Sequence, residues 1–188
     1  MPRSAKGGRA GPDRIEEIIA AARERAARVR PGGGERQEEV EKAKQAMLRL
    51  LSVRMRSRWE LRSKLSGRRF SPRALDDALN DLERVGLVDD GKFARLFLES
   101  RLHRRPRSYR ILRRELSSKG VPDEMIEEAV EELQREVSEE ELARQALGPR
   151  MGRMKKMGPE QARARAARFL SGKGFARSVI EELLRDLQ

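Results

Sequence analysis

The hydrophobic residues of this chain recur at the spacing of an α-helix. Between residues 72 and 84, Leu75, Ala78, Leu79 and Leu82 lie at positions i, i+3, i+4 and i+7, which places them on one face of a helix. No stretch of the sequence alternates hydrophobic and polar residues over the length of a strand. The pattern therefore predicts an all-α protein.

Three similar segments indicate that this helical pattern is repeated. They are LSGRRF at 65–70, LSSKGV at 116–121 and LSGKGF at 170–175, and they follow one another at offsets of 51 and 54 residues. Repeats of 20–50 residues are typical of supersecondary units that stack on one another and share a core. We predict tandem three-helix repeats over 41–89, 90–137 and 138–188.

Residue types typical of helix ends separate the predicted helices. Ser71 and Pro72 provide an N-cap and a proline at the first helical position. Ser57 and Glu60 have the spacing of a capping box, in which each side chain bonds to the backbone N–H of the other residue. A glycine is placed to end each middle helix: Gly67, Gly120 and Gly174. The expected core consists of these leucines: Leu61, Leu65, Leu79, Leu82, Leu112, Leu116, Leu133, Leu170, Leu183 and Leu187.

The first forty residues differ from the repeats. Residues 1–12 are rich in Gly, Pro and Arg, and RPGGGERQEE at 30–39 has the composition of a flexible polar break. Between them, residues 13–29 could form a short helix with a hydrophobic stripe. We interpret residues 1–40 as a flexible extension.

Composition adds a strong positive charge to this picture. The 188 residues include 43 Lys and Arg against 31 Asp and Glu, a formal net charge of +12. Residues 1–40 hold nine of the basic and seven of the acidic residues, so the repeats carry most of the excess. Such a balance favours an anionic partner.

Within each repeat the basic residues gather around the second helix, whereas the third helix is acidic or mixed. The acidic helix could neutralise its basic neighbour through surface ion pairs. Alternatively, stacked repeats could align three basic patches along a long anionic partner, either a phosphate backbone or an acidic protein groove. The candidate binding residues are Arg54, Arg56, Arg58, Arg62, Arg105, Arg107, Arg110, Arg113, Lys155, Lys156, Arg165 and Arg168.

Several classes of function have little support in the sequence. The chain has no cysteine and one histidine, His103, which leaves almost no material for a zinc site or a nucleophilic triad. The segment from Gly86 to Lys92 resembles half of a phosphate-binding loop, but Phe93 follows where a hydroxyl is needed. No run approaches the length of a membrane span. We expect a soluble cytoplasmic protein without enzyme activity, metal or cofactor, acting as a monomer.

Trp59 and Tyr109 lie near the starts of the first two middle helices, among arginines. An aromatic side chain in this setting can stack on a nucleic-acid base, or it can anchor the packing of a helix. We favour the packing role for both residues.

The sequence from about 43 to 187 resembles the RecX family of regulatory proteins. The resemblance rests on four short motifs in order: Arg56-Ser57 with Glu60-Leu61 and Leu65, Val88-Asp89-Asp90 with Phe93-Ala94, Glu115-Leu116 with Lys119-Gly120-Val121, and Lys173-Gly174-Phe175. It implies an elongated, curved array of three-helix repeats that binds the filament of the RecA recombinase on DNA. It also implies inhibition of strand exchange and of ATP hydrolysis by RecA, and a part in DNA repair, recombination and the SOS response. The alternative is a helical DNA-binding protein that acts independently of RecA.

Overall fold

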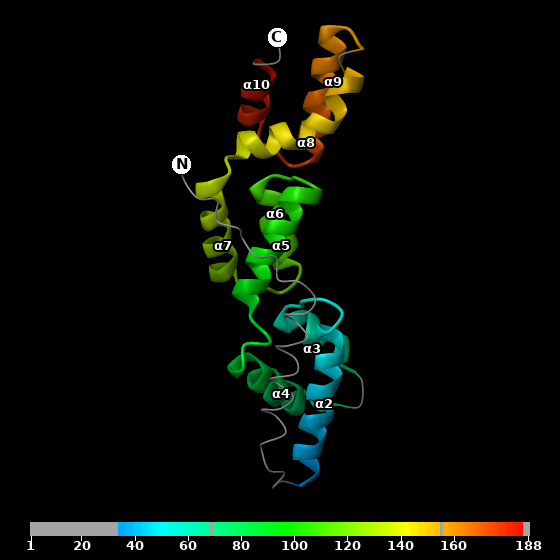
Figure 1. The fold of residues 1–188 in the computed structure, drawn as a ribbon, viewed down its shortest axis with the longest axis vertical. Coiled ribbons are helices and arrows are strands. Elements are labelled where there is room, and N and C mark those ends of the chain that lie inside the picture. The colour runs from blue at the N-terminus through cyan, green and yellow to red at the C-terminus, as the bar shows by residue number, and fades with distance from the viewer. Residues whose placement is uncertain (1–33, 68–69, 155, 186–188) are drawn as a thin grey trace, which may run out of the picture. The chain divides into compact units, whose positions relative to one another are not determined.

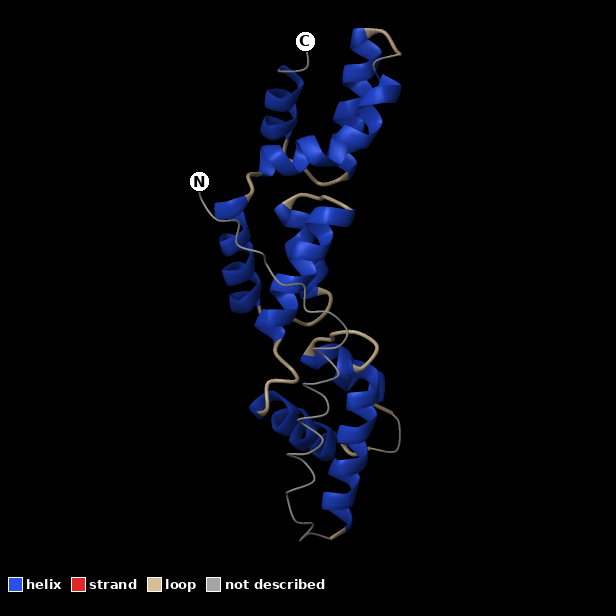
Figure 2. Cartoon of the chain, in the orientation of Figure 1, coloured by secondary structure: helices blue, strands red, loops and turns tan. Residues whose placement is uncertain are grey.

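The computed structural model describes residues 34–67, 70–154 and 156–185. Over these residues it contains nine helices and no strand, which confirms the all-α repeat fold (Figure 2). Figure 1 labels the helices. Their bounds are α2 Glu35–Leu51, α3 Arg58–Leu65, α4 Pro72–Arg84, α5 Asp90–Arg104, α6 Tyr109–Ser117, α7 Asp123–Glu136, α8 Glu139–Met154, α9 Pro159–Gly172 and α10 Arg177–Arg185.

The described chain divides into two compact units, one ending at Asp89 and the other beginning at Asp90. In the first unit, α2 packs against both α3 and α4 (Figure 1). Its core takes Met47 from α2, Leu61 from α3 and Leu79 from α4, all fully buried. In this unit a single apolar stripe from each helix is enough to form a shared core.

The second unit contains six helices. Among its first three helices, α7 packs against both α5 and α6. Its last three helices, α8, α9 and α10, all contact one another. Nine of the ten leucines expected in the core of the protein are buried, and Leu187 lies outside the described residues. Substitution of such a leucine by alanine typically costs about 2–5 kcal/mol of stability.

The helix ends follow the local signals in the sequence. The hydroxyl of Ser57 accepts a hydrogen bond from the backbone N–H of Glu60 at 3.1 Å, and that of Ser71 accepts one from Ala74 at 3.2 Å. The three predicted turn glycines all have positive φ: Gly67 at 77°, Gly120 at 69° and Gly174 at 87°. The cap at Ser57 begins the second helix of its group, whereas the cap at Ser71 and the three glycine turns lie between a second helix and a third.

The start of the first helix differs from the expectation for residues 30–39. α2 begins at Glu35, so the predicted polar break is wrong for residues 35–39. The carboxylate of Glu39 accepts hydrogen bonds from the backbone N–H and the hydroxyl of Ser71, at 2.5 and 3.0 Å, and Val40 is buried. These contacts join residues that are distant in the sequence, and α2 therefore begins earlier than its hydrophobic residues alone predict. The possible helix at 13–29 lies outside the described residues.

Candidate functional site

In the first unit, acidic residues of α4 already hold basic residues of α3. Arg58 forms an ion pair with Glu83 and donates a hydrogen bond to the side chain of Asn80 at 3.0 Å. Arg62 forms an ion pair with Asp76. The acidic third helix thus neutralises the second helix at these two positions, as the ion-pair interpretation predicts.

The other two candidate arginines of this unit lie between α2 and α3 and also have partners. Arg54 forms an ion pair with Glu60 at 2.8 Å. Arg56 is half-buried and donates from Nε to the backbone oxygen of Leu50 at 3.2 Å. Trp59, beside them, is 51% exposed, so its expected packing role is wrong. The aromatic ring is instead open to solvent among arginines.

Among the candidate residues in and beside the second unit's first three helices, some form ion pairs and others do not. Arg113 of α6 pairs with Glu127 of α7 at 2.8 Å, and Arg107 pairs with Glu115 at 3.2 Å. Arg110 donates to the backbone oxygen of Gly174 at 3.3 Å. Arg105 is exposed and has no ion pair within the described residues.

Tyr109, in contrast to Trp59, is a packing anchor. It is 2% exposed, and its hydroxyl donates to the backbone oxygen of Val137 at 2.5 Å. Its backbone N–H donates to the carboxylate of Glu139 at 3.2 Å. Burial, with a smaller contribution from the negative charge of Glu139, raises the pKa of the phenol from 10.0 to about 12. These bonds tie the start of α6 to the segment between α7 and α8.

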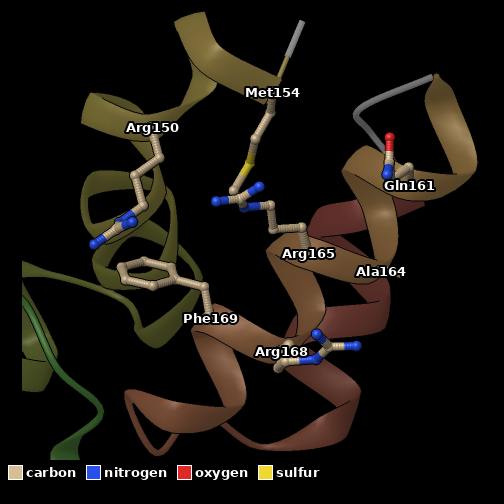
Figure 3. Close-up of a pocket in the computed structure, with 7 residues that line it drawn as sticks. All are labelled: Arg150, Met154, Gln161, Ala164, Arg165, Arg168 and Phe169. Atoms are coloured by element: carbon tan, nitrogen blue, oxygen red, sulfur yellow. The ribbon is translucent and has the colours of Figure 1, made fainter. Parts of the chain in front are cut away.

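The basic residues of α9 are less neutralised. Arg165 and Arg168 are exposed, and in the described part of the chain neither forms an ion pair. Both line a cavity of about 520 Å³ together with Arg150, Met154, Gln161, Ala164 and Phe169. Figure 3 shows Arg165 reaching toward Met154 and Arg150 lying beside the ring of Phe169. Lys156 is also exposed, and Lys155 lies outside the described residues.

Three residues absent from the predicted set complete this region. The guanidinium of Arg150 lies over the ring of Phe169, 4.3 Å from its centroid, and the ammonium of Lys173 lies 5.5 Å from the same centroid. Lys173 belongs to the repeated LSGKGF segment, so the repeat itself was a usable signal for it. Arg150 corresponds to Arg101 at the 49-residue spacing that relates Ala94 to Ala143, whereas Phe169 has no aromatic residue at the repeat offset. Arg101 likewise lies over a phenylalanine ring, that of Phe97, 4.8 Å from its centroid.

Burial lowers the pKa of Lys173 below the ordinary value of a lysine. The neighbouring positive charges of Arg107, Arg150 and Arg105 lower this pKa further, and Glu115 partly opposes them. Basic residues from α8, from the turn after α9 and from the loop before α6 therefore lie near one another.

In the described residues, no group of His, Asp and Glu side chains is arranged to hold a metal ion. Among the described helices, none combines the length and the hydrophobicity that a membrane crossing requires.

Comparison with known proteins gives the family. The chain is 38% identical over 154 residues to the "Regulatory protein RecX" of Amycolatopsis mediterranei (strain U-32), covering 80% of this chain and 87% of the relative. The chain belongs to the RecX family. The family models for the first and second three-helix domains of RecX match residues 43–82 and 89–130. A regulatory protein RecX of Thermus thermophilus is 38% identical over 139 residues, covering 73% of this chain and 87% of the relative.

Solved RecX structures share the fold. The crystal structure of RecX from Lactobacillus salivarius matches with a TM-score of 0.70 at 20% identity, over 80% of this chain and 97% of that chain. A second crystal structure of regulatory protein RecX matches with a TM-score of 0.66 at 23% identity. The resemblance noted in the sequence is thus confirmed, and a RecX regulatory role goes with it.

Proposed function

We propose that this chain binds the RecA recombinase on DNA and lowers its ATP hydrolysis and strand exchange, without catalysing a reaction itself. Membership in the RecX family is the observation that carries the proposal. The protein acts as a monomer in the cytoplasm, and its basic residues meet the negative charge of the filament.

The ion pairs rank the candidate residues by how readily each can contact a partner. Arg58 and Arg62 must break intramolecular ion pairs before they can contact a partner, whereas Arg165 and Arg168 need not. Breaking an exposed pair costs about 0.2–1 kcal/mol, which subtracts from the energy of any new contact. The residues of α9 therefore contribute most to partner binding.

The alternative is a DNA-binding protein that acts independently of RecA. The exposed ring of Trp59 favours it, because an aromatic side chain among arginines can stack on an unpaired base. Trp59 is the only tryptophan in the chain, so its fluorescence reports directly on such stacking.

Binding measurements over a range of salt concentrations distinguish the two functions. The ligands are naked single-stranded DNA, RecA alone and the RecA–DNA filament. The proposed function predicts the tightest binding to the filament and little quenching of Trp59 by naked DNA. Equal affinity for naked DNA and filament, with Trp59 quenched by both, would support the alternative.

Charge-reversal variants locate the binding surface in the same measurement. Arg165→Glu with Arg168→Glu is expected to weaken filament binding by at least tenfold. The matched control is Arg135→Glu with Arg144→Glu, which makes the same change in net charge at exposed positions of α7 and α8 outside the candidate set. Equal weakening by both double variants would indicate that only net charge matters.

A further inference from the structure

Four basic residues of the second unit lie close enough for the charges of three of them to act on the fourth, Lys173. Arg105 and Arg107 belong to the loop before α6, Arg150 belongs to α8, and Lys173 follows α9. We call these four residues the junction cluster. The backbone N–H of Ser108 donates to the backbone oxygen of Lys173 at 3.2 Å, so the loop and the turn are in direct contact.

The junction cluster carries more positive charge than its neighbours neutralise. Glu115 pairs with Arg107 at 3.2 Å and with Arg101 at 2.9 Å, so it is already shared. Within the described residues, Arg105, Arg150 and Lys173 form no ion pair, although the charge of Glu115 also acts on Lys173. Like charges held close together destabilise one another, and a bound anion removes that cost.

The cluster is held in place by the fold. Arg150 lies over the ring of Phe169, and the ammonium of Lys173 lies near the same ring. Gly174, directly after Lys173, contacts α6 so closely that an added Cβ would lie 2.3 Å from Cγ1 of Ile111. Cations that are already positioned lose less conformational entropy when they bind a ligand.

The positive charge also continues away from the junction. Arg150 and Phe169 line the 520 Å³ cavity whose other walls include Arg165 and Arg168 (Figure 3). A row of cations matches a chain of phosphates better than it matches a single small anion. Guanidinium groups suit this role because they bind phosphate oxygens through paired hydrogen bonds.

We infer that the junction cluster, continued by Arg165 and Arg168, binds successive phosphates of a single-stranded nucleic acid without reading its sequence. The inference rests on the proposed function for its biological partner, the DNA of the filament. Its physical content, a phosphate-binding track at the junction, does not require RecA.

The test uses the full chain and a fluorescent thymidine oligonucleotide, with anisotropy recorded over a series of salt concentrations. The variant Arg105→Gln with Arg150→Gln removes two junction charges, and Arg135→Gln with Arg144→Gln removes two charges elsewhere in the same unit. A single-stranded phosphate contact contributes about 0.7 to the slope of log affinity against log salt. The junction variant is expected to lower this slope by about 1.4 and the affinity by tenfold or more, and the control variant to change neither.

Lys173→Gln provides a second variant that leaves Arg150 on the Phe169 ring, and circular dichroism checks the helices of every variant. An unchanged salt slope in both folded junction variants would overturn the inference. So would displacement by polyglutamate but not by oligonucleotide, which would assign the site to an acidic protein.

Inorganic phosphate and ATP, added as competitors, identify the source of the phosphate. A polymeric track predicts that the oligonucleotide competes far better than either small anion. Equal competition by ATP at the same phosphate concentration would overturn the assignment to a nucleic-acid strand. Because no RecA is present, this result is separate from any failure of the proposed function.

Discussion

Arginines at comparable places in the helical groups have different electrostatic surroundings. Arg58 on α3 is fixed to Glu83, whereas Arg165 on α9 forms no ion pair within the described residues and lies at the edge of a cavity. The difference follows from their neighbours, since α4 presents Asp76 and Glu83 toward α3. Residue identity alone therefore does not separate a structural arginine from one available to a partner.

Tyr109 gives a prediction at this scale, because it is the only tyrosine and its pKa is raised to about 12. Its unfolded pKa is near 10, so burial favours the neutral phenol. The stabilisation is complete below about pH 10 and is lost as the pH rises through about 12. Tyrosinate absorbance should therefore appear near pH 12 in the native protein and near pH 10 in urea.

The variant Tyr109→Phe removes this absorbance change and serves as the control. Ionisation of the native protein at about pH 10, with its helices intact by circular dichroism, would show that Tyr109 is open to solvent.

At the scale of elements, the turn after α9 fits against α6. Gly174 has a φ of 87°, and its backbone oxygen accepts a hydrogen bond from Arg110 at 3.3 Å. A Cβ at this position would also lie 2.7 Å from the hydroxyl of Ser108, the buried N-cap of α6. Only glycine suits both the conformation and the close approach.

The substitution Gly174→Ala should therefore destabilise the second unit by more than the cost of placing alanine in a left-handed backbone conformation. Gly86→Ala is the matched control, because Gly86 has a φ of 73° and nothing within 4 Å of an added Cβ. We expect a loss of about 1–2 kcal/mol for Gly86→Ala, from the left-handed backbone alone. Gly174→Ala should cost clearly more, measured by urea unfolding followed by circular dichroism. Equal losses of stability in the two variants would mean that α6 shifts to make room for the added methyl group without cost.

Local signals made many element boundaries predictable. The serine caps and the turn glycines act within a few residues, so the sequence alone was sufficient for Ser57, Ser71 and Gly120. The start of α2 was not predictable in this way, because the bonds between Glu39 and Ser71 join positions 32 residues apart. Trp59 was misjudged because a hydrophobic side chain does not reveal whether a neighbouring helix covers it.

For the whole molecule, the repeat and its hydrophobic period were enough to predict an all-α repeat fold and a leucine core. The candidate site was less predictable, because it depends on which charges meet across helices. Arg150, Phe169 and Lys173 come from separate segments, and the sequence did not indicate their proximity. The twelve candidate binding residues themselves stay a prediction.

The rate of ATP hydrolysis by RecA on single-stranded DNA is the most direct test of the central claim. The purified chain should lower this rate progressively as its concentration rises. The variant Arg165→Glu with Arg168→Glu should need a clearly higher concentration for the same effect than Arg135→Glu with Arg144→Glu. A rate that stays unchanged at saturating concentrations of the wild-type chain would contradict the account.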